Sequence, residues 1–200
     1  MMICALVLAA GESKRMGRPK QLLPFGRQTL IEKVVENVTK SGVDITLIVL
    51  GAHREKIIEK LKNFAVKQVD NPRFREGMLS SVQAGFNAVP KEAQAVVVIL
   101  GDQPTVPSKV IDRIIDTYRK TGKGIVLPVF QNKRGHPILI DTKYSLEVAE
   151  LDQDIGLKAL IRDHAGDIEE VAVATPAILK DIDYPEDYFR ELKKTGDETQ

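Results

Sequence analysis

The sequence predicts an α/β fold: a three-layer sandwich in which a mostly parallel mixed sheet lies between two layers of helices. Strand-like apolar runs alternate with helical patterns along almost the whole chain. The apolar runs are continuous rather than alternating, which is typical of strands covered on both faces. The length of 200 residues fits one domain, so we expect a single domain over residues 1–194 and a frayed polar tail over residues 195–200.

The predicted strands are runs of consecutive apolar residues. They cover Ile3–Ala9, Ile45–Leu50, Ala95–Leu100 and Ile125–Phe130. Between them, apolar residues recur at helical spacing and predict helices over residues 30–38, 54–62, 79–89 and 110–118. Thr29 with Glu32 has the capping-box pattern at the start of the first helix, and Gly122 ends the last one. This alternation favours right-handed crossovers within one sheet.

The pattern changes after Phe130. A polar turn is followed by a short strand, two short helices, two further strands and a helix with Pro185 in its first turn. The five segments before that helix cover Ile138–Ile140, residues 143–150, residues 156–163, Glu170–Ala174 and Ile178–Ile182. We expect this C-terminal extension to cover one end of the same sheet and to contribute an antiparallel strand, rather than to form a separate domain.

The composition excludes several classes of protein. Lysine and arginine number 29 against 28 aspartates and glutamates, so the formal net charge of +1 gives no electrostatic basis for a nucleic-acid or membrane-surface partner. The apolar run Ile3–Ala10 is too short to span a bilayer and lacks the basic flank of a signal peptide. The single Cys4 cannot form an internal disulfide, which fits a reducing compartment. We therefore expect a cytoplasmic protein.

The loop after the first strand carries the strongest chemical signal. Ligands of open α/β sheets bind at the carboxyl ends of the strands, so this loop is the first candidate for a phosphate site. Small residues at Ala9–Gly11 let backbone N–H groups approach an anion. Arg15 can hold two phosphate oxygens at once, and Lys20 supplies a mobile positive charge. The alternative is a solvated basic loop, since neither the Walker A nor the G-x-G-x-x-G pattern is present.

The segment Leu8–Lys20 has the pattern L-A-A-G-x-S-x-R-M-G-x-x-K, and further motifs follow it. They are Gly77–Gly85, Leu100–Pro104, Gly135–Pro137 and Asp181–Asp187. This set resembles the molybdenum cofactor cytidylyltransferase family of the MobA-like nucleotidyltransferase superfamily, with the molybdopterin guanylyltransferases and methylerythritol-phosphate cytidylyltransferases as cousins. The resemblance implies the Rossmann-like nucleotide-diphosphosugar transferase fold, in agreement with the α/β prediction.

Asp102 lies just past the carboxyl end of the apolar strand Ala95–Leu100, beside the first loop in a parallel sheet. A carboxylate there can hold Mg²⁺ against triphosphate oxygens, and the alternative is a cap for the turn before Pro104. The resemblance implies Asp183 as the second metal ligand, with Asp181 as the weaker candidate. Either aspartate can instead be the N-cap of the last helix.

The resemblance places the nucleotide on the first loop and at the start of the helix near residue 79. The residues implied are Leu8, Ala9, Ala10, Gly11, Ser13, Gly77, Ser80, Ser81 and Gly101. Backbone N–H groups and serine hydroxyls after Gly77 can meet the base or the ribose, and a plain helix cap by Ser80 or Ser81 is the alternative. In related enzymes the position of Ala10 is often Gly for guanine and Ala for a pyrimidine, which favours CTP.

The resemblance also implies residues for the acceptor, namely His136, Gly156 and Asp181. A structural role is the alternative for His136. The family pattern Gly-Asp-x-Gly that ends at Gly156 is broken here, because Gln153 replaces its first glycine.

The implied reaction is the Mg²⁺-dependent transfer of CMP from CTP to the phosphate of molybdopterin or the molybdenum cofactor, with release of pyrophosphate. Arg15, Lys20 and Asp102 are the implied catalytic residues: the cations stabilise charge on the phosphates, and Asp102 holds the metal. The alternatives are a guanylyltransferase, a cytidylyltransferase for another phosphorylated small molecule, and a non-catalytic, nucleotide-binding assembly factor. A molybdoenzyme or its chaperone is the expected protein partner.

Overall fold

A computed structural model describes residues 1–194, and the predicted polar tail at 195–200 lies outside the described residues. The main sheet has the strand order β10-β7-β9-β6-β1-β4-β5, and β8 pairs with β7. Its strands are β1 (Met2–Ala9), β4 (Ile45–Leu50), β5 (Lys67–Asp70), β6 (Ala93–Leu100), β7 (Ile125–Phe130), β8 (Lys133–Arg134), β9 (Ile138–Asp141) and β10 (Ile168–Ala172). The pairs β1–β4, β1–β6, β4–β5 and β7–β10 are parallel, whereas β9 is antiparallel to both neighbours.

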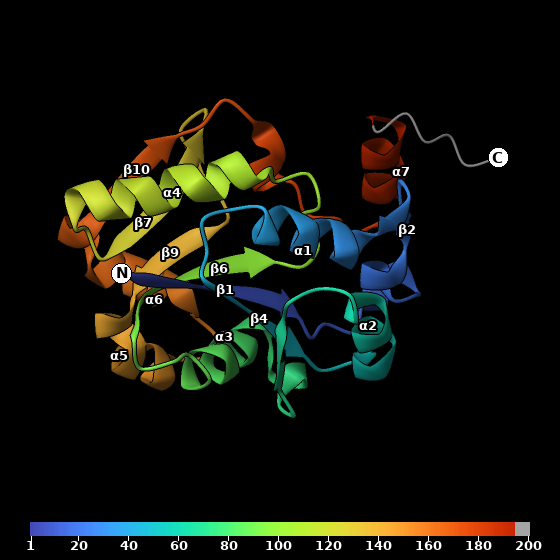
Figure 1. The fold of residues 1–200 in the computed structure, drawn as a ribbon, viewed down its shortest axis with the longest axis horizontal. Coiled ribbons are helices and arrows are strands. Elements are labelled where there is room, and N and C mark those ends of the chain that lie inside the picture. Colours follow the sequence, from blue (N-terminus) through green and yellow to red (C-terminus); the bar gives the residue numbers. More distant parts are fainter. Residues whose placement is uncertain (195–200) are drawn as a thin grey trace.

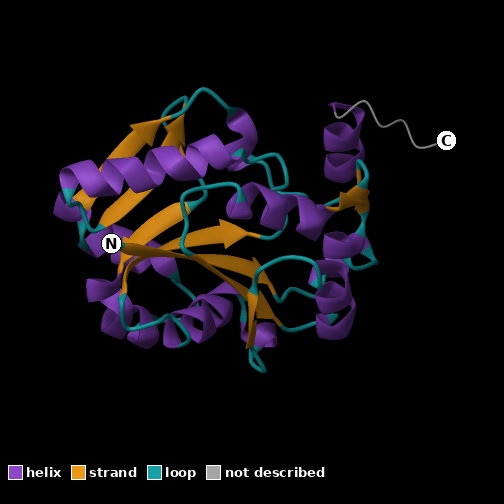
Figure 2. Ribbon diagram, viewed as in Figure 1, coloured by secondary structure: helices purple, strands orange, loops and turns teal. Residues whose placement is uncertain are grey.

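Helices cover both faces of this sheet (Figures 1 and 2). On one face, α1 (Leu30–Thr39), α2 (Arg54–Leu61) and α4 (Ser108–Thr121) pack over the sheet. On the other face lie α3 (Met78–Asn87), α5 (Ser145–Glu150) and α6 (Leu157–Asp163). The predicted α/β three-layer sandwich is confirmed. None of the helices among residues 1–194 combines the length and apolar character that a membrane span requires.

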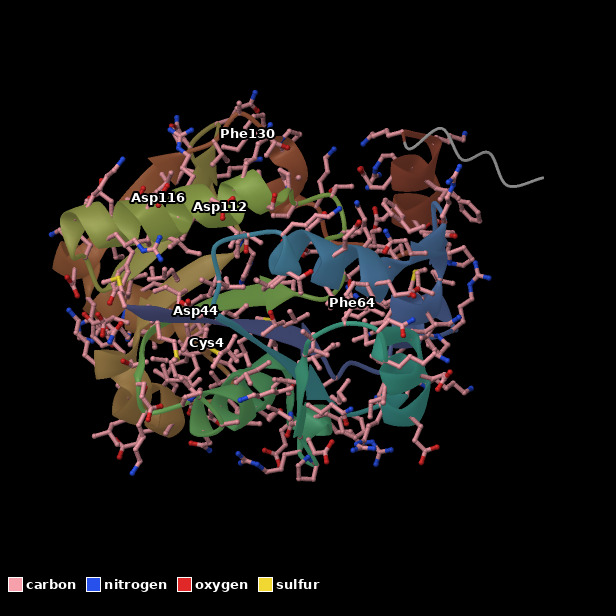
Figure 3. The ribbon with its side chains drawn as sticks, viewed as in Figure 1. Cys4, Asp44, Phe64, Asp112, Asp116 and Phe130 are labelled. Atoms are coloured by element: carbon pink, nitrogen blue, oxygen red, sulfur yellow. The ribbon has the colours of Figure 1, made fainter. Side chains whose placement is uncertain are left out.

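The two helix layers explain why the strands are apolar without interruption. Along β1, Ile3, Ala5 and Val7 belong to the core under α1 and α4, while Cys4 and Leu6 belong to the core under α3. Water is excluded from both faces of the sheet, so a polar side chain on β1 would be unfavourable whichever face it pointed to. Figure 3 shows the outer side of α4, where Asp112 and Asp116 lie away from this core.

The C-terminal part departs from the prediction in its placement. Strand β9 lies inside the sheet, between β6 and β7, instead of covering one end. The predicted strand Ile178–Ile182 is wrong: residues Pro176–Leu179 form a short 3-10 helix, which Thr175 caps by accepting a hydrogen bond from the Ala177 backbone N–H. Ile178 and Ile182 are both buried and hold this segment against the protein core, although neither belongs to a strand.

A small separate cluster ties the first loop to the C-terminal helix α7 (Pro185–Lys194). Its members are buried apolar residues of the first loop, of α1 and of the chain around α7: Met16, Leu23, Phe25, Leu30, Ile182, Tyr188 and Leu192. The Tyr188 hydroxyl donates a 2.7 Å hydrogen bond to the Pro24 carbonyl, in the short hairpin of β2 (Pro24–Phe25) and β3 (Gln28–Thr29). This cluster holds together two segments that are far apart in the sequence, on the side of the molecule toward which β1 and β6 point (Figure 1).

Candidate functional site

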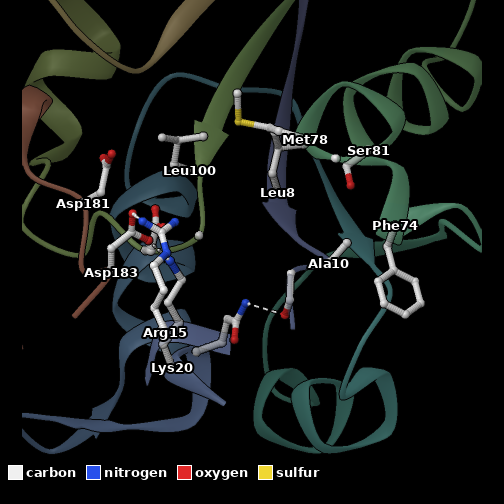
Figure 4. Close-up of a pocket in the computed structure, with 15 residues that line it drawn as sticks. Leu8, Ala10, Arg15, Lys20, Phe74, Met78, Ser81, Leu100, Asp181 and Asp183 are labelled. Atoms are coloured by element: carbon white, nitrogen blue, oxygen red, sulfur yellow. Dashed lines mark hydrogen bonds and ion pairs between the residues drawn. The ribbon is translucent and has the colours of Figure 1, made fainter. Parts of the chain in front are cut away.

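Two neighbouring cavities lie at the carboxyl ends of the parallel strands. The first cavity has a volume of about 360 Å³ and is lined by Leu8, Ala10, Gly11, Arg15, Lys20, Gln21, Phe74, Gly77, Met78, Ser81, Leu100, Gly101, Asp102, Asp181 and Asp183 (Figure 4). The second cavity, of about 630 Å³, is lined by Met78, Leu127, Arg134, Gly135, His136, Ile138, Ile155, Gly156, Leu157, Lys158, Ile161 and Arg162. Met78 lines both cavities and therefore stands between them.

The first loop leaves β1 and folds back on itself through side-chain hydrogen bonds. Ser13 adopts the left-handed conformation with φ of 58°, and its hydroxyl accepts a 3.1 Å hydrogen bond from the Lys20 backbone N–H. The same hydroxyl donates to Gln21 Oε1 at 3.1 Å, and Gln21 Nε2 donates to the Gly11 carbonyl at 3.4 Å. Ser13 thus shapes the loop and does not line the first cavity. Gln21, which is buried, was not predicted from the sequence.

The charged side chains of the first cavity form one connected cluster. Lys20 Nζ lies 2.5 Å from Asp102 Oδ2 and 2.8 Å from Asp183 Oδ1, so one ammonium group bridges both carboxylates. Arg15 Nη1 lies 3.0 Å from Asp183 Oδ2, and its guanidinium carbon is 5.3 Å from the centre of the Tyr184 ring. Figure 4 shows Arg15 and Lys20 extending in the same direction toward Asp183. The structure therefore brings together the three predicted catalytic residues and Asp183, the stronger candidate for the second metal ligand.

Burial shapes the charge state of this cluster. Burial raises the pKa of Asp102 above the ordinary value for an aspartate, and the Lys20 ammonium opposes that effect. For Lys20, burial alone would lower the pKa, but the ion pairs with Asp102 and Asp183 outweigh it, so the pKa of Lys20 is raised. Lys20 is consequently a cation over the physiological range.

Asp102 has the properties of a residue that holds a hard cation. Its Oδ1 atom is buried and has no hydrogen-bond partner within the described part of the chain. Carboxylate oxygens are the ligands that Mg²⁺ prefers, and Mg²⁺ commonly takes one or two of them and completes its shell with phosphates and water. In residues 1–194, no group of three or more His, Cys, Asp or Glu side chains is placed to hold a metal. The site therefore fits a divalent ion that arrives with further oxygen ligands.

The carboxylates of the three aspartates near the start of α7 have different partners. Asp187, rather than Asp183, accepts hydrogen bonds from the backbone N–H groups of Asp183 and Tyr184 at the start of the helix, which leaves the Asp183 carboxylate to Arg15 and Lys20. Asp181 Oδ1 instead accepts a 2.6 Å hydrogen bond from Gln103 Nε2. Asp181, which was predicted as an acceptor residue or as the weaker metal ligand, lines the first cavity and not the second.

The opposite wall of the first cavity comes from the start of α3. Ser81 lines the cavity, and Asn71 Nδ2 donates a 3.0 Å hydrogen bond to its hydroxyl. Ser80 is fully buried and donates to the Gly77 carbonyl at 2.8 Å, so it points away from the cavity. Neither serine caps α3: Gly77 is its N-cap, and the start of the helix has no side-chain cap hydrogen bond.

The inner wall of the first cavity comes from the ends of the strands. Leu8, Ala10, Gly11 and Gly101, four of the residues predicted to bind the nucleotide, line it, whereas Ala9 faces the core under α1. A side chain at Gly101 would meet the Leu8 carbonyl oxygen at 2.6 Å, so only glycine fits there. Phe74, Met78 and Leu100 complete the lining, and the sequence did not predict them.

The second cavity differs in chemistry. Six of its lining residues are apolar, and its charged side chains are the cations Arg134, Lys158 and Arg162, with no acidic residue among them. His136 and Gly156, the other two residues predicted for the acceptor, both line it. Burial lowers the pKa of His136, which keeps its imidazole neutral near pH 7 against the opposing charge of Asp181. This cavity suits a ligand with an apolar body and an anionic group.

Comparison with known proteins identifies the family. Residues 5–168 match the MobA-like NTP transferase domain. The chain belongs to this family. It is therefore a nucleotidyltransferase, and its sheet and helices have the nucleotide-diphosphosugar transferase fold.

Similar proteins carry more than one functional name. A molybdenum cofactor cytidylyltransferase of Escherichia coli K12 is 27% identical over 192 residues, which is 94% of each chain. A nicotine blue oxidoreductase of Paenarthrobacter nicotinovorans is 29% identical over 199 residues, covering 95% of this chain and 96% of that one. The crystal structure of Rv0371c from Mycobacterium tuberculosis superimposes with a TM-score of 0.86 at 29% identity, over 96% of this chain and 98% of that one.

Proposed function

We propose that the chain is a cytidylyltransferase that moves CMP from CTP to the phosphate of molybdopterin or the molybdenum cofactor. The observation that carries this proposal is the cluster of Arg15, Lys20, Asp102 and Asp183 in a cavity that adjoins a second cavity lined by apolar side chains and three cations. The first cavity offers ligands for a triphosphate and a divalent ion, and the second offers space for the acceptor. The similarity to the Escherichia coli cytidylyltransferase supports the choice of substrates.

In this reaction an acceptor phosphate oxygen attacks the α-phosphorus of CTP. A new P–O bond forms, the bond between the α-phosphorus and the bridging oxygen breaks, and pyrophosphate leaves with that electron pair. The acceptor phosphate is already an anion, so no side chain has to remove a proton. The work of the protein is to align the two substrates and to neutralise charge on the transferring group, which Arg15 and Lys20 are placed to do.

We propose Mg²⁺ as the cofactor, held by Asp102 and Asp183. When bound, the ion would neutralise triphosphate charge and polarise the α-phosphoryl group. The unpartnered, buried Asp102 Oδ1 supports this assignment. A further structure of Rv0371c is a complex with manganese, which supports a divalent ion in this family.

The preference for CTP follows from the width of the first cavity. Ala10 is 4% exposed and lines this cavity together with Phe74 and Ser81. The Ala10 methyl group narrows the space available to a base, and a pyrimidine is smaller than a purine. Gly77 and Ser81 provide backbone and hydroxyl groups for the base or the ribose on the other side.

Other functions remain as alternatives to be separated by assay. A guanylyltransferase and a cytidylyltransferase for another phosphorylated molecule use the same cluster, and a non-catalytic assembly factor for a molybdoenzyme needs only the nucleotide. The relative named nicotine blue oxidoreductase is as similar overall as the cytidylyltransferase, so identity alone does not choose between these names. The charged cluster favours nucleotidyl transfer. We also propose a cytoplasmic location, with a molybdoenzyme or its chaperone as protein partner.

The test is pyrophosphate release measured with CTP and with GTP, in Mg²⁺, with molybdopterin or molybdenum cofactor as acceptor. We expect release that depends on the acceptor and a higher kcat/KM for CTP. A higher kcat/KM for GTP would overturn the cytidylyl assignment. No release with either nucleotide, while CTP still binds, would favour the assembly factor.

A further inference from the structure

Lys20 has an unusual position for a residue that is expected to hold phosphates. Its ammonium nitrogen touches Asp102 Oδ2 and Asp183 Oδ1 at the same time, at 2.5 and 2.8 Å. The Lys20 and Asp102 side chains are only 13% and 17% exposed, so water screens this contact weakly. These two carboxylates are also the proposed metal ligands. Lys20 and a divalent ion therefore compete for the same two carboxylate groups, although Asp102 Oδ1 itself has no partner in the described residues.

The competition follows from the small space between the two carboxylates. Lys20 Nζ lies 2.5 Å from Asp102 Oδ2 and 2.8 Å from Asp183 Oδ1, so a divalent ion held by both carboxylates would lie close to the ammonium group. A divalent ion beside an ammonium group in a buried site would also be strongly repelled. Lys20 has to leave at least one carboxylate before the ion can bridge them.

A bound nucleotide would offer Lys20 phosphate oxygens in place of the two carboxylates. Lys20 lies in the same cavity as Arg15, Gly11 and Gly77, where we have proposed that the triphosphate binds. Lysine is flexible and strongly attracted to phosphate oxygens, so it can exchange two carboxylates for phosphates without leaving the cavity. Arg15 is bound less firmly to the carboxylates than Lys20, because it pairs with Asp183 alone of the two and its side chain is 57% exposed.

We propose that Lys20 is an internal counter-ion that closes the metal site until a nucleotide draws it away, so that the divalent ion and the nucleotide bind cooperatively. This inference rests on the proposed binding of a nucleotide and a divalent ion in the first cavity, and it adds the order in which they can enter. Coupling between two ligands is reciprocal, so the ion also favours the nucleotide. Lys20 then has two roles: it blocks the metal site when no nucleotide is bound, and it binds the phosphates when a nucleotide is present.

The experiment measures Mn²⁺ binding by electron paramagnetic resonance of the free ion, without nucleotide. We expect weak binding to the wild type and binding at least about tenfold tighter to Lys20→Met, which keeps the length and removes the charge. Lys20→Arg should bind Mn²⁺ as weakly as the wild type because it retains the charge. Lys14→Met is the matched control: it removes a lysine from the same loop, but Lys14 is 79% exposed and pairs with Glu12, so Mn²⁺ binding should not change.

The same titration is repeated with saturating CTP, corrected for Mn²⁺ held by free CTP. CTP should tighten Mn²⁺ binding to the wild type more than it does to Lys20→Met. If Lys20→Met does not fold, as judged by thermal unfolding, Lys20→Gln gives the same comparison with a hydrogen-bond donor retained. Equal Mn²⁺ affinity of the wild type and the uncharged variants without CTP would overturn the gate and leave the proposed function intact. Absence of Mn²⁺ binding in every protein, with and without CTP, would overturn the proposed metal site itself.

Discussion

The two cavities that share Met78 differ in how their charged side chains are paired. In the first cavity, Arg15 and Lys20 pair with carboxylates of the same cavity, so the charges are fixed internally before any ligand binds. In the second cavity no acidic residue lines the wall, and the cations Arg134 and Arg162 pair with Glu170 and Asp163, which lie outside its lining.

This difference assigns different tasks to the two cavities. A cavity with paired charges of both signs can take up an anion and a cation together, because its own cations turn to the anion and its own carboxylates turn to the cation. A nucleotide and its metal ion are such a pair. A cavity lined by apolar side chains and cations can hold a ligand by its apolar body and attract its anionic group. We therefore propose that the first cavity serves chemistry on phosphates and that the second recognises the acceptor. Four variants, one of which carries two substitutions, test this division.

The largest effect is expected for Asp102→Asn. The amide keeps the shape of the side chain but loses the charge that holds the metal, so kcat in Mg²⁺ should fall by about 10²- to 10³-fold. Binding of CTP without metal, measured by calorimetry, should change little. The control is Asp116→Asn on the exposed side of α4, which should keep the wild-type rate. A wild-type turnover of CTP by Asp102→Asn would contradict the metal role.

Arg15→Ala should have the next largest effect. Charge on the transferring group grows in the transition state, so the loss of Arg15 should lower kcat, by about a hundredfold, more than it weakens the binding of CTP. Steady-state kinetics separates the two quantities. Arg18→Ala removes an exposed arginine that does not line the first cavity and is the matched control. A change confined to KM for CTP would mean that Arg15 binds the ground state and the transition state equally.

A paired substitution tests the second cavity. Lys158→Gln combined with Arg162→Gln removes two cations of the second cavity, so KM for the acceptor should rise by about tenfold, while the Kd of CTP stays the same. The control removes two exposed cations from α4, on the opposite face of the sheet, by Arg119→Gln with Lys120→Gln. A loss of CTP affinity in the first pair, with KM for the acceptor unchanged, would reverse the roles of the cavities.

The smallest effect is expected for Ala10→Gly. Removal of one methyl group from the wall of the first cavity should lower the preference for CTP over GTP by up to about tenfold, because a single methyl group discriminates only modestly. The ratio of the two kcat/KM values, with one acceptor, gives the result. A full switch to GTP is not expected, since other groups contact the edge of the base. An unchanged ratio would show that Ala10 does not set the width of the site.

The sequence was informative where one physical cause produced the pattern. Strands β1, β4, β6 and β7 were predicted because both of their faces are buried, which leaves a continuous apolar run. Strand β5 was missed because Lys67–Asp70 lies at the edge of the sheet and is mostly exposed, so it has no such run. In Ile178–Ile182 the apolar residues were mistaken for a strand, because burial of a loop gives the same short signal as burial of a strand.

The residues of the candidate site likewise divide into those that the sequence predicted and those that it did not. Arg15, Lys20 and Asp102 were predicted because they follow apolar strands, and Asp183 because it belongs to a motif of the family. Phe74, Met78 and Gln103 were not assigned a role, although the last two lie in such motifs, because their contacts in the site depend on how distant segments pack. Ser80 and Ser81 are adjacent in the sequence, yet only Ser81 lines the cavity, because the helical rotation at the start of α3 turns Ser80 inward.

The division of the site into a nucleotide cavity and an acceptor cavity can be tested most directly by methyl NMR of the wild-type protein. Ala10 has its methyl group in the lining of the first cavity, Ile155 and Ile161 have theirs in the second, and Met78 reports on both. We expect CTP with Mg²⁺ to shift the signals of Ala10 and Met78 and to leave those of Ile155 and Ile161 in place. The acceptor should then shift Ile155, Ile161 and Met78. Shifts of Ile155 and Ile161 on addition of CTP alone, with Ala10 unchanged, would contradict the account.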